Sequence, residues 1–373
     1  MISIRIGNCL DVLKTLPRNH FDTVVTSPPY YGLRDYNTGT WVGGDPNCPH
    51  KRLTKISKDT ATGHANMYDH GDVVGDAIYR QECPNCGAKR QDEQIGLELT
   101  PQDYVRRLVE VFREVRHTLR DDGTLWLNLG DSYHNYRADG GSNVKQTLHN
   151  TKHDQPESSP HRANKINGLK QKDLMGIPWR VALALQEDGW YLRQDIIWHK
   201  PNPMPESVQD RCTKAHEYIF LLSKNSHYYF DHESIQEEAS QNRWGGKTPI
   251  NIDNSKDKEN VFNGLTRERD MMPETKNKRS VWTVNTKPYK EAHFAVFPTD
   301  LIEPCIKAGS PKDGHVLDPF GGSGTTGLVA DRLNRNATII ELNKDYIQIA
   351  EDRLMGETPL FTKVKVQCQR KKI

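Results

Sequence analysis

Short apolar runs that read as strands alternate with amphipathic helical stretches along most of this chain. Apolar residues recur three and four positions apart, which predicts helices, in residues 101–119, 178–188, 299–309 and 325–333. The first residues read as a strand followed by a helix start, and further strands are expected in residues 22–26, 124–129, 191–199, 218–223, 314–320 and 336–343. Strands separated by amphipathic helices pack side by side beneath them. The pattern therefore predicts an α/β fold with a mostly parallel, helix-covered sheet.

Polar stretches interrupt this alternation. Residues 34–94 and 134–172 are too long for ordinary connections, so we interpret them as insertions into one domain that covers residues 1–373. A third irregular stretch, residues 235–290, is basic. Its part from 241 to 290 holds 11 Lys and Arg against 6 Asp and Glu, although the whole chain has a net charge of only +2. This local excess fits either a solvated surface or, beside a catalytic site, a region that binds nucleic acid.

Composition excludes several classes of protein. The chain is 35% hydrophobic and 27% charged, and its apolar runs, such as residues 218–222, are far too short to cross a bilayer. The N-terminus lacks the basic and then apolar layout of a secretory signal. Seven scattered cysteines, an odd number, favour a reducing compartment over a framework of disulfides. We therefore expect a soluble, cytoplasmic protein without a membrane partner.

The strand expected at residues 22–26 stops abruptly at Ser27, Pro28, Pro29 and Tyr30. Proline has no amide N–H, so the carbonyls around it cannot continue a ladder and remain available to a ligand's amino group. The Ser27 hydroxyl adds a further acceptor, and the Tyr30 ring adds an aromatic face. The alternative is a plain turn with Tyr30 packed in the core.

A glycine-rich turn follows a later expected strand. Gly322, Gly324 and Gly327 satisfy the pattern Gly-x-Gly-x-x-Gly at a helix start, and Glu341 ends the next strand. Asp318, at the carboxyl end of the first of these strands, would repel the pyrophosphate of a dinucleotide. S-adenosylmethionine carries an ammonium, a sulfonium and ribose hydroxyls but no phosphate, so it is the ligand that we expect here. A dinucleotide and an ordinary turn are the alternatives.

The segments TSPPY (residues 26–30) and DPFGGSGTT (residues 318–326) together resemble catalytic motif IV and cofactor motif I of the amino-group DNA methyltransferases. Their order, with the catalytic motif first, is similar to the β class, in which the methyltransferase fold is circularly permuted. Residues 6–16 resemble motif III, with Asn8 in place of the usual Asp, and residues 195–205 resemble motif VIII. The resemblance covers most of the chain and implies a Rossmann-like fold around a seven-stranded mixed sheet.

The resemblance also implies roles for individual residues. Those expected to bind S-adenosylmethionine are Asn8, Cys9, Asp318, Pro319, Phe320, Gly322, Gly324, Thr325 and Glu341. Those expected to contact double-stranded DNA are Lys200, Arg279 and Trp282, although the last two alternatively only anchor a loop. Residues 235–290 become the expected target-recognition region. A cognate restriction endonuclease is a possible partner, and both a monomer and a homodimer are compatible with the resemblance.

The resemblance gives the proline motif a chemical role. An exocyclic amine on a base is a poor nucleophile because its lone pair is delocalised into the ring, and acceptors aimed at both N–H groups help the nitrogen to pyramidalise. Ser27 Oγ and the Pro28 carbonyl are the expected acceptors, and Tyr30 offers a face on which a flipped-out base can stack. The amine then attacks the sulfonium methyl in line and loses a proton, without a covalent enzyme intermediate.

The identity of the base is inferred from Ser27. In family members that resemble this chain, serine at the first motif position mainly accompanies methylation of cytosine N4, whereas aspartate accompanies adenine N6. We therefore expect a site-specific cytosine-N4 methyltransferase, with adenine N6 as the alternative. Methylation at cytosine C5 needs a cysteine nucleophile, and Cys9, Cys212 and Cys305 lie outside any such motif. More distant alternatives are an RNA or protein amide methyltransferase, a dinucleotide oxidoreductase, and a zinc-bearing DNA-binding module without catalysis.

The first insertion contains a separate group of candidate metal ligands. Cys83-x-x-Cys86 has the spacing with which two thiolates hold a zinc ion. The candidates that complete a set of four are Cys48 and His50, with His64 and His70 as rivals. An insertion this polar lacks apolar residues for a core of its own, so we expect a structural zinc ion. The alternative is a loop with free thiols.

Overall fold

The computed structural model describes residues 1–32, 36, 38–48, 50, 82–83, 85–134, 168–239, 275–287, 296–357 and 363–368. The strands of its main sheet are β1 (Ile2–Ile6), β2 (Phe21–Thr26), β5 (Leu119–Leu129), β6 (Tyr191–His199), β7 (His216–Ser223), β10 (Val281–Thr283), β11 (His315–Asp318), β12 (Asn336–Glu341) and β13 (Val364–Cys368). The helices are α1 (Cys9–Leu13), α2 (Pro101–Thr118), α3 (Ile177–Glu187), α4 (Thr299–Gly309), α5 (Thr325–Arg332) and α6 (Lys344–Glu357), with a short 3-10 helix at Glu233–Ile235. Two small antiparallel ribbons pair β3 (Thr40–Val42) with β4 (Lys89–Gln91) and β8 (Glu237–Glu238) with β9 (Thr275–Lys276).

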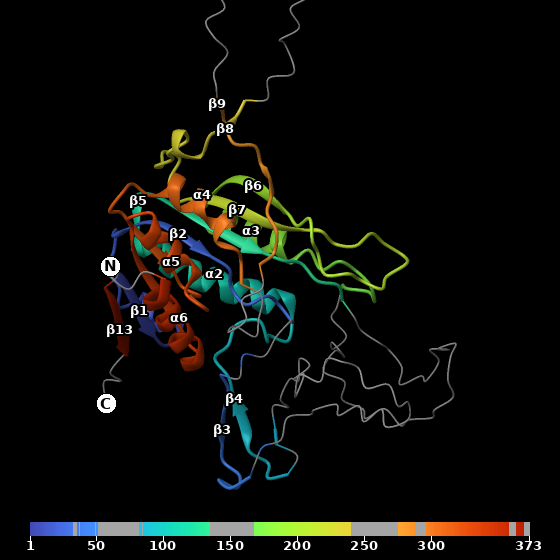
Figure 1. The fold of residues 1–373 in the computed structure, drawn as a ribbon. Helices are drawn as coiled ribbons and strands as arrows, with labels where there is room; N and C mark the ends of the chain where they lie inside the picture. Colours follow the sequence, from blue (N-terminus) through green and yellow to red (C-terminus); the bar gives the residue numbers. More distant parts are fainter. Residues whose placement is uncertain are drawn as a thin grey trace, which may run out of the picture.

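Within the described residues, nine strands form the main sheet in the order β10-β6-β7-β5-β2-β11-β12-β1-β13 (Figure 1). The strand β7 runs antiparallel to both of its neighbours, β5 and β6. Every other neighbouring pair in this sheet is parallel. The sheet is therefore mixed and mostly parallel, as predicted.

The seven strands expected from the sequence are the seven central neighbours of this sheet, from β6 to β1. The structure adds one short strand at each edge, β10 and β13, which the sequence analysis did not predict. β10 is only three residues long, and β13 reads VKVQC, so neither forms an apolar run that stands out. The four predicted helices are present, and α6 is an additional one. The predicted α/β class is confirmed.

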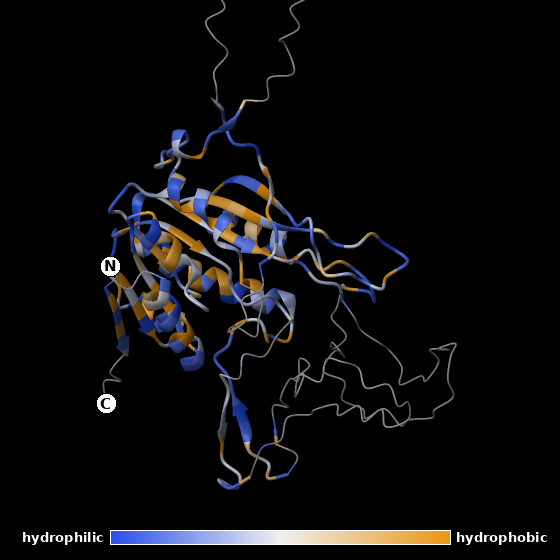
Figure 2. Ribbon diagram, in the orientation of Figure 1, coloured by the Kyte–Doolittle hydropathy of each residue, from blue (hydrophilic) through white to orange (hydrophobic). Residues whose placement is uncertain are grey.

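Helices cover both faces of the sheet (Figure 1). The helices α1, α2 and α3 pack on one face, and α4, α5 and α6 pack on the other. Along β5, Leu125 and Leu127 face the first layer whereas Trp126 faces the second, as the alternation of a strand requires. Central strands are thus buried on both faces, and hydrophobic colour runs along them in Figure 2. This double burial explains why they read as continuous apolar runs in the sequence.

The strands β2 and β11 determine where a ligand can bind. They are parallel neighbours, with Thr23 opposite Val316 and Val24 opposite Leu317. The first helix of the main layers after β2 is α2, on one face of the sheet, whereas β11 is followed by α5 on the opposite face. Because the chain leaves the two strand ends toward opposite faces, a crevice opens between them at the carboxyl edge of the sheet.

Much of the two predicted insertions and of the basic stretch 235–290 lies outside the described residues, namely residues 51–81, 135–167, 240–274 and 288–290. The rival ligands His64 and His70 fall there too. The described part of the first insertion contains the ribbon of β3 and β4, which projects from the body of the molecule (Figure 1). The organisation as one domain with two insertions and a target-recognition region at residues 235–290 stays a prediction. No helix in the described ranges combines the length and the apolar character that crossing a bilayer demands.

Packing of α4 against β2 and β5 gives a testable prediction. A Cβ atom at Gly309 would lie 2.5 Å from Thr23 Oγ1 and 2.9 Å from Thr124 Oγ1, two buried hydroxyls that bond to each other. We expect Gly309→Ala to lower the free energy of unfolding by about 1 to 3 kcal/mol through overpacking. Gly356, also helical, has open space around it, so Gly356→Ala should stabilise the protein by about 0.5 to 1 kcal/mol. Urea denaturation of both variants measures the difference, and equal stabilities would contradict the packing described.

Candidate active site

A cavity of about 980 Å³ lies at the carboxyl ends of the parallel strands. The proline motif after β2, residues 27–30, forms one part of its wall, and the glycine turn after β11, residues 319–323, forms another. Residues at the ends of β6 and β12 and at the start of β7 contribute as well. Two motifs that lie at opposite ends of the sequence therefore share one cavity.

Hydrogen bonds hold the side chain of Tyr30 at this wall. Its hydroxyl oxygen lies 2.7 Å from Glu217 Oε2, 3.1 Å from Asn128 Oδ1 and 3.4 Å from Ser27 Oγ. A phenol has one proton, so the shortest contact makes Glu217 its acceptor. Burial raises the pKa of Tyr30 well above its ordinary value, which keeps the phenol protonated. A Cβ at Gly130 would come within 2.5 Å of the Tyr30 ring, so only glycine fits behind it.

The hydrogen bonds from Ser27 to Tyr30 and from Tyr30 to Glu217 both donate toward the carboxylate. Because Tyr30 donates to Glu217, its oxygen is free to accept the proton of Ser27 across the longer contact. The Ser27 oxygen then keeps its lone pairs for an incoming N–H group, and the chain of bonds ends on a carboxylate that polarises it. The arrangement presents Ser27 to the cavity as a hydrogen-bond acceptor.

Two lysines lie in the same part of the cavity. Lys200 Nζ donates to Glu217 Oε1 and stands 4.2 Å from the centre of the Trp198 ring, and the Lys200 side chain is only 18% exposed. Lys214 Nζ donates to the Asp131 carbonyl at 3.2 Å. Burial lowers the pKa of Lys214. The structure thus places Lys200, which we predicted as a DNA contact, beside the proline motif.

Glu217 and Asn128 were missed by the sequence analysis. Each carries a signal that was available, because Asn128 interrupts the apolar strand segment TLWLNL and Glu217 directly precedes the apolar run YIFLL. A polar side chain inside a strand that is otherwise buried on both faces needs a partner. The sequence does not reveal that this partner is Tyr30.

The backbone carbonyls of the two motif prolines differ in their partners. Pro28 and Pro29 line the cavity, and the Pro29 carbonyl accepts a hydrogen bond of 2.9 Å from the Tyr104 hydroxyl. Among the described residues, none donates a hydrogen bond to the Pro28 carbonyl. Gly96 approaches the motif so closely that a Cβ there would lie 3.0 Å from the Tyr30 carbonyl. The backbone of the motif is therefore fixed by its neighbours, and one carbonyl remains for a ligand.

The glycine turn is held by Glu341 at the end of β12. Glu341 Oε2 accepts the Gly322 amide at 2.8 Å, and Oε1 accepts the Asn343 amide at 2.7 Å. Gly322 and Gly324 have φ values of +49° and +78°, which favour glycine, and a Cβ at Gly324 would lie only 3.0 Å from the Ala350 Cβ. Burial raises the pKa of Glu341, and the amides oppose this shift. Each carboxylate oxygen still has a lone pair for a ligand hydroxyl.

The structure corrects the role expected for Asp318. This side chain is 1% exposed and is not among the residues that line the cavity. Its Oδ1 accepts the Thr26 hydroxyl at 2.6 Å and the Phe320 amide at 3.0 Å, and Oδ2 accepts the Thr326 hydroxyl at 2.6 Å. Burial raises its pKa against these three donors. Asp318 therefore joins the ends of β2 and β11 to the start of α5, and the predicted direct contact with a ligand's ammonium group is wrong.

The other expected cofactor residues line the cavity: Asn8, Cys9, Pro319, Phe320, Gly322, Thr325 and Glu341. Gly324 lies behind this surface as the residue that precedes α5. The Asn8 side chain accepts the Leu10 amide at 2.9 Å and so caps α1. Burial raises the pKa of Cys9 to about 12, so this cysteine stays a neutral thiol and is a poor nucleophile.

The two residues predicted near DNA from the basic stretch differ in their surroundings. Trp282 is only 6% exposed, packs 6.4 Å from Trp126 between ring centres, and donates its indole N–H to the Arg279 carbonyl. It is a core residue at the edge of the sheet, and the DNA contact predicted for it is wrong. The Arg279 side chain is 74% exposed and pairs with Glu237 at 2.5 Å. Its contact with DNA stays a prediction.

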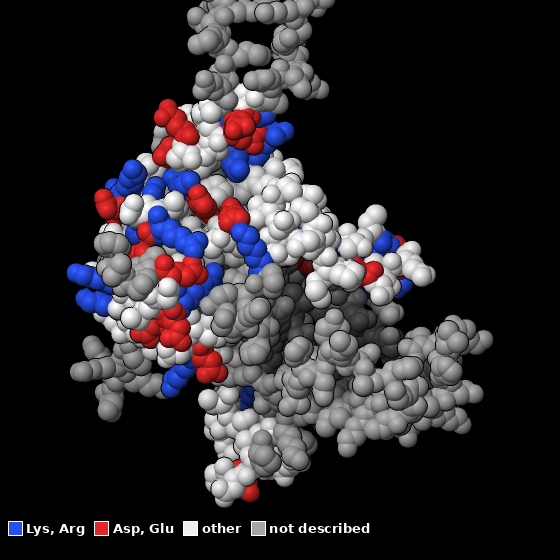
Figure 3. All heavy atoms as spheres, in the orientation of Figure 1, with Lys and Arg blue, Asp and Glu red and all other residues white. Residues whose placement is uncertain are grey.

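Charge on the outer surface is mixed. On the face that Figure 3 shows, Lys and Arg are interspersed with Asp and Glu over the described residues. A mixed surface of this kind matches the net charge of +2 for the chain. This face therefore offers no large patch of one sign. Lys200 and Lys214 lie in the cavity wall itself, where they can meet a ligand.

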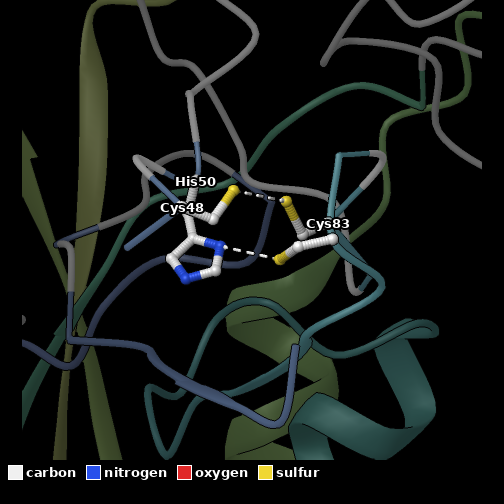
Figure 4. A group of neighbouring side chains, drawn as sticks. Cys48, His50 and Cys83 are labelled. Atoms are coloured by element: carbon white, nitrogen blue, oxygen red, sulfur yellow. Dashed lines mark hydrogen bonds between the residues drawn. The ribbon is translucent and has the colours of Figure 1, made fainter. Parts of the chain in front are cut away.

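A second cluster lies beside the ribbon of β3 and β4. The ligand atoms of Cys48, His50, Cys83 and Cys86 all lie within 4.8 Å of one another. Cys48 Sγ is 3.8 Å from Cys83 Sγ, and Cys86 Sγ is 3.6 Å from His50 Nδ1 (Figure 4). The Trp41 ring stacks on the His50 ring at 4.6 Å between centres. The structure thus brings together the four residues predicted as metal ligands.

Comparisons with known proteins agree with this geometry. A family model described as DNA methylase, of the N6 and N4 class, matches residues 21–352. The chain is 40% identical over 352 residues to the Type II methyltransferase M.SmaI of Serratia marcescens, covering 94% of this chain and 90% of that protein. It is 40% identical over 355 residues to the Type II methyltransferase M.Cfr9I of Citrobacter freundii, covering 94% and 87%.

Two solved structures show the same fold. The cytosine-N4-specific PvuII DNA methyltransferase superposes with a TM-score of 0.53 and 15% identity over 98% of this chain and 94% of that one. The putative DNA modification methylase TTHA0409 of Thermus thermophilus, in complex with S-adenosyl-L-methionine, gives a TM-score of 0.53 and 19% identity over 99% of both chains. The predicted Rossmann-like methyltransferase fold is confirmed, and its two motifs follow the permuted order. The family match and the two relatives at 40% identity show that this chain belongs to the N6/N4 DNA methylase family.

Proposed function

We propose that this enzyme transfers a methyl group from S-adenosylmethionine to the exocyclic N4 amine of cytosine at a specific site in duplex DNA. The observation that carries the proposal is the single cavity whose wall contains both the proline motif and the glycine turn. A base amine held at Ser27 and a ligand held at Gly322 and Glu341 would occupy one continuous space. Holding two reactants together in this way lowers the activation free energy by about 7 to 11 kcal/mol.

The residues of the glycine turn fit S-adenosylmethionine. Residues 319–325 and 340–342 carry a single charge, that of Glu341. The neighbouring Arg353 donates from Nη1 to Ser323 and Thr325 and is not among the residues that line the cavity. The lone pairs left on Glu341 suit the two hydroxyls of a ribose. When bound, S-adenosylmethionine supplies an electrophilic methyl group on a sulfonium sulfur. Asn8, Phe320 and Thr325 line the same space and would hold the rest of the molecule.

The proline motif fits the other reactant. The Ser27 oxygen and the Pro28 carbonyl would accept the two N–H bonds of an exocyclic amine, which favours a pyramidal nitrogen with an available lone pair. Tyr30, whose hydroxyl donates to Glu217, would stack on a base that has left the duplex. Its hydroxyl is already bonded, so the ring orientation does not have to be set on binding.

Cytosine is the base that suits this pocket best. Ser27 is a neutral acceptor, whereas an aspartate at this position would repel the ring acceptors N3 and O2 of cytosine. Lys200 and Lys214 in the same wall are donors for such acceptors, of which adenine offers fewer on this edge. Cytosine C5 methylation is disfavoured because the thiol that lines the cavity, Cys9, is held neutral by burial.

The biological setting is part of the proposal. The relatives M.SmaI and M.Cfr9I are named Type II methyltransferases, so we infer a cytoplasmic modification enzyme that protects DNA from a cognate endonuclease. Residues 235–290 form the target-recognition region in this interpretation, and Arg279 is an exposed cation of its described part. The basic excess of this stretch supplies the phosphate contacts.

The four-residue cluster is proposed as a structural zinc site. A tetrahedral zinc ion with Zn–S bonds of about 2.3 Å places two sulfurs about 3.8 Å apart, and a sulfur and a nitrogen about 3.6 Å apart. The distances of 3.8 Å and 3.6 Å in the cluster match these edges. Cys48, His50, Cys83 and Cys86 would hold the ion and so join the strand β3 to the turn before β4.

The first prediction of this function concerns Ser27. Incubation of genomic DNA with labelled S-adenosylmethionine, followed by digestion to nucleosides, should yield N4-methylcytosine. Ser27→Ala should lower the single-turnover rate on the order of 10² to 10³, because a positioned acceptor at developing charge is lost, while affinity for both substrates is kept. Tyr30→Ala should instead destabilise the flipped base by about 1 to 3 kcal/mol. N6-methyladenine as product would overturn the base assignment, and a Ser27→Ala enzyme at the parental rate would overturn the role of the motif.

The second prediction concerns Glu341 and compares it with Asp318. Glu341→Gln should weaken binding of S-adenosylmethionine by about 1 to 3 kcal/mol in calorimetry, because a charged acceptor of the ligand's hydroxyls is lost. Asp318→Asn should chiefly lower the stability of the fold, since its carboxylate meets three protein donors. NAD should not bind the parental enzyme. Tight NAD binding, or full affinity of Glu341→Gln for S-adenosylmethionine, would contradict this site.

The third prediction concerns the proposed zinc site. Cys83→Ser or Cys86→Ser should release about one zinc ion per chain and make the β3–β4 ribbon sensitive to protease, with a smaller effect on the main sheet. Cys212→Ser is the matched control, because this cysteine is exposed and lies outside the cluster. Elemental analysis and limited proteolysis give the two readouts. A parental protein that contains no zinc and still has a resistant ribbon would refute the assignment.

A further inference from the structure

One exposed hydrophobic side chain stands apart from the others. Met204 is 86% exposed, more than any other exposed large hydrophobic residue in the described part of the chain. It is also the only residue of that exposed group that lines the cavity of the proline motif. Single exposed hydrophobic residues are common on protein surfaces, so what distinguishes Met204 is its place in the wall of this cavity.

The topology places Met204 at the mouth of the cavity. The strand β6 runs parallel to β5 and β2, since β7 is antiparallel to both β5 and β6 and β5 is parallel to β2. The carboxyl end of β6 therefore lies at the same edge of the sheet as Ser27. The loop that follows, residues 200–215, starts at this edge and projects beyond the body of the molecule (Figure 1).

The backbone on either side of Met204 is held in place. Pro203 and Pro205 flank it and restrict the backbone on both sides. Two residues before Met204, Asn202 donates from Nδ2 to the Thr286 carbonyl at 3.2 Å and accepts the Thr286 amide on Oδ1 at 3.0 Å. This reciprocal pair attaches the start of the loop to the segment after β10. The side chain of Met204 is thus presented by a rigid support.

The returning half of the loop is braced by charge. Arg211 Nη1 donates to Glu206 Oε2 at 2.5 Å, and its guanidinium lies 3.9 Å from the centre of the Tyr133 ring. Asp210 pairs with Lys172 at 2.5 Å. These contacts hold the loop by ion pairing and leave the Met204 side chain in solvent.

We propose that Met204 is a wedge that enters the base stack of duplex DNA and occupies the space that the target base leaves when it flips into the cavity. This inference rests on the proposed function, because only a base-flipping enzyme needs such a residue. Extrusion of a base costs stacking and pairing, and an apolar side chain inserted between base steps recovers part of that cost. Methionine suits this role because it is long, unbranched and polarizable.

The test compares matched and mismatched DNA. The methylation site is first located in genomic DNA treated with the enzyme, and short duplexes are made with the target base either paired or opposite a non-complementary base. Met204→Ala should lower the single-turnover rate on the paired duplex by about 10- to 100-fold, the equivalent of a lost stacking contact. On the mismatched duplex, where the base is already unpaired, the rate should return to within about threefold of the parental rate.

Two control variants complete the design. Met204→Leu keeps an apolar wedge and should retain most activity, and Met355→Ala, an exposed methionine on α6, should match the parental enzyme on both duplexes. Parental rates for Met204→Ala on the paired duplex, or an equal loss on both duplexes, would overturn the wedge. A parental enzyme that methylates no DNA would instead overturn the proposed function and this inference with it. Methylation of adenine would overturn only the base assignment, because the Met204 comparison holds for any flipped base.

Discussion

The parallel pairing of β2 with β11 is the constraint on which the site depends. It brings the carboxyl ends of two strands from opposite ends of the chain to one edge, and Asp318 joins them by accepting the hydroxyls of Thr26 and Thr326. A carboxylate this deeply buried is tolerated only because three donors satisfy it. The same interaction thereby sets the distance between the proline motif and the glycine turn. The contribution of Asp318 to the site is architectural, since it determines where both reactants are held.

The two parts of the cavity use different electrostatics. At the glycine turn, the Glu341 carboxylate faces the cavity and is held by backbone amides that leave lone pairs free, whereas Asp318 and Arg353 bond to the turn from behind. Around the proline motif, Glu217 accepts a hydrogen bond from Lys200, and it also directs hydrogen bonds from Tyr30 and Ser27 toward itself. A neutral serine becomes a directed acceptor because its own proton has somewhere to go. The chemistry of the motif thus depends on residues from β5 and β7 as much as on the four residues of the motif.

Sequence reasoning succeeded where a local pattern has one structural outcome. Strand patterns between amphipathic helices marked the seven central strands, and the spacing of Cys83 and Cys86 with Cys48 and His50 marked the cluster that the structure brings together. It failed where the role of a residue depends on the direction in which its side chain points. Asp318 ends a strand, but its chain neighbours do not show that it turns inward to Thr26, and Trp282 in a basic stretch does not show that it packs on Trp126. Glu217 was missed because its partner, Tyr30, lies 187 positions away.

The core and the loops of this enzyme are stabilised by different means, for a reason that follows from burial. The sheet and its helices bury continuous apolar surface on both faces, so hydrophobic packing keeps the strand ends in place. The β3–β4 ribbon and the loop of residues 200–215 have too few apolar residues for that. The ribbon instead brings four metal-ligating side chains together, and the loop relies on ion pairs, on Arg211 over Tyr133 and on proline. Restraints of this kind fix a backbone without covering its side chains. They therefore allow a loop beside the cavity to be rigid and still expose Met204, a combination that hydrophobic packing would exclude.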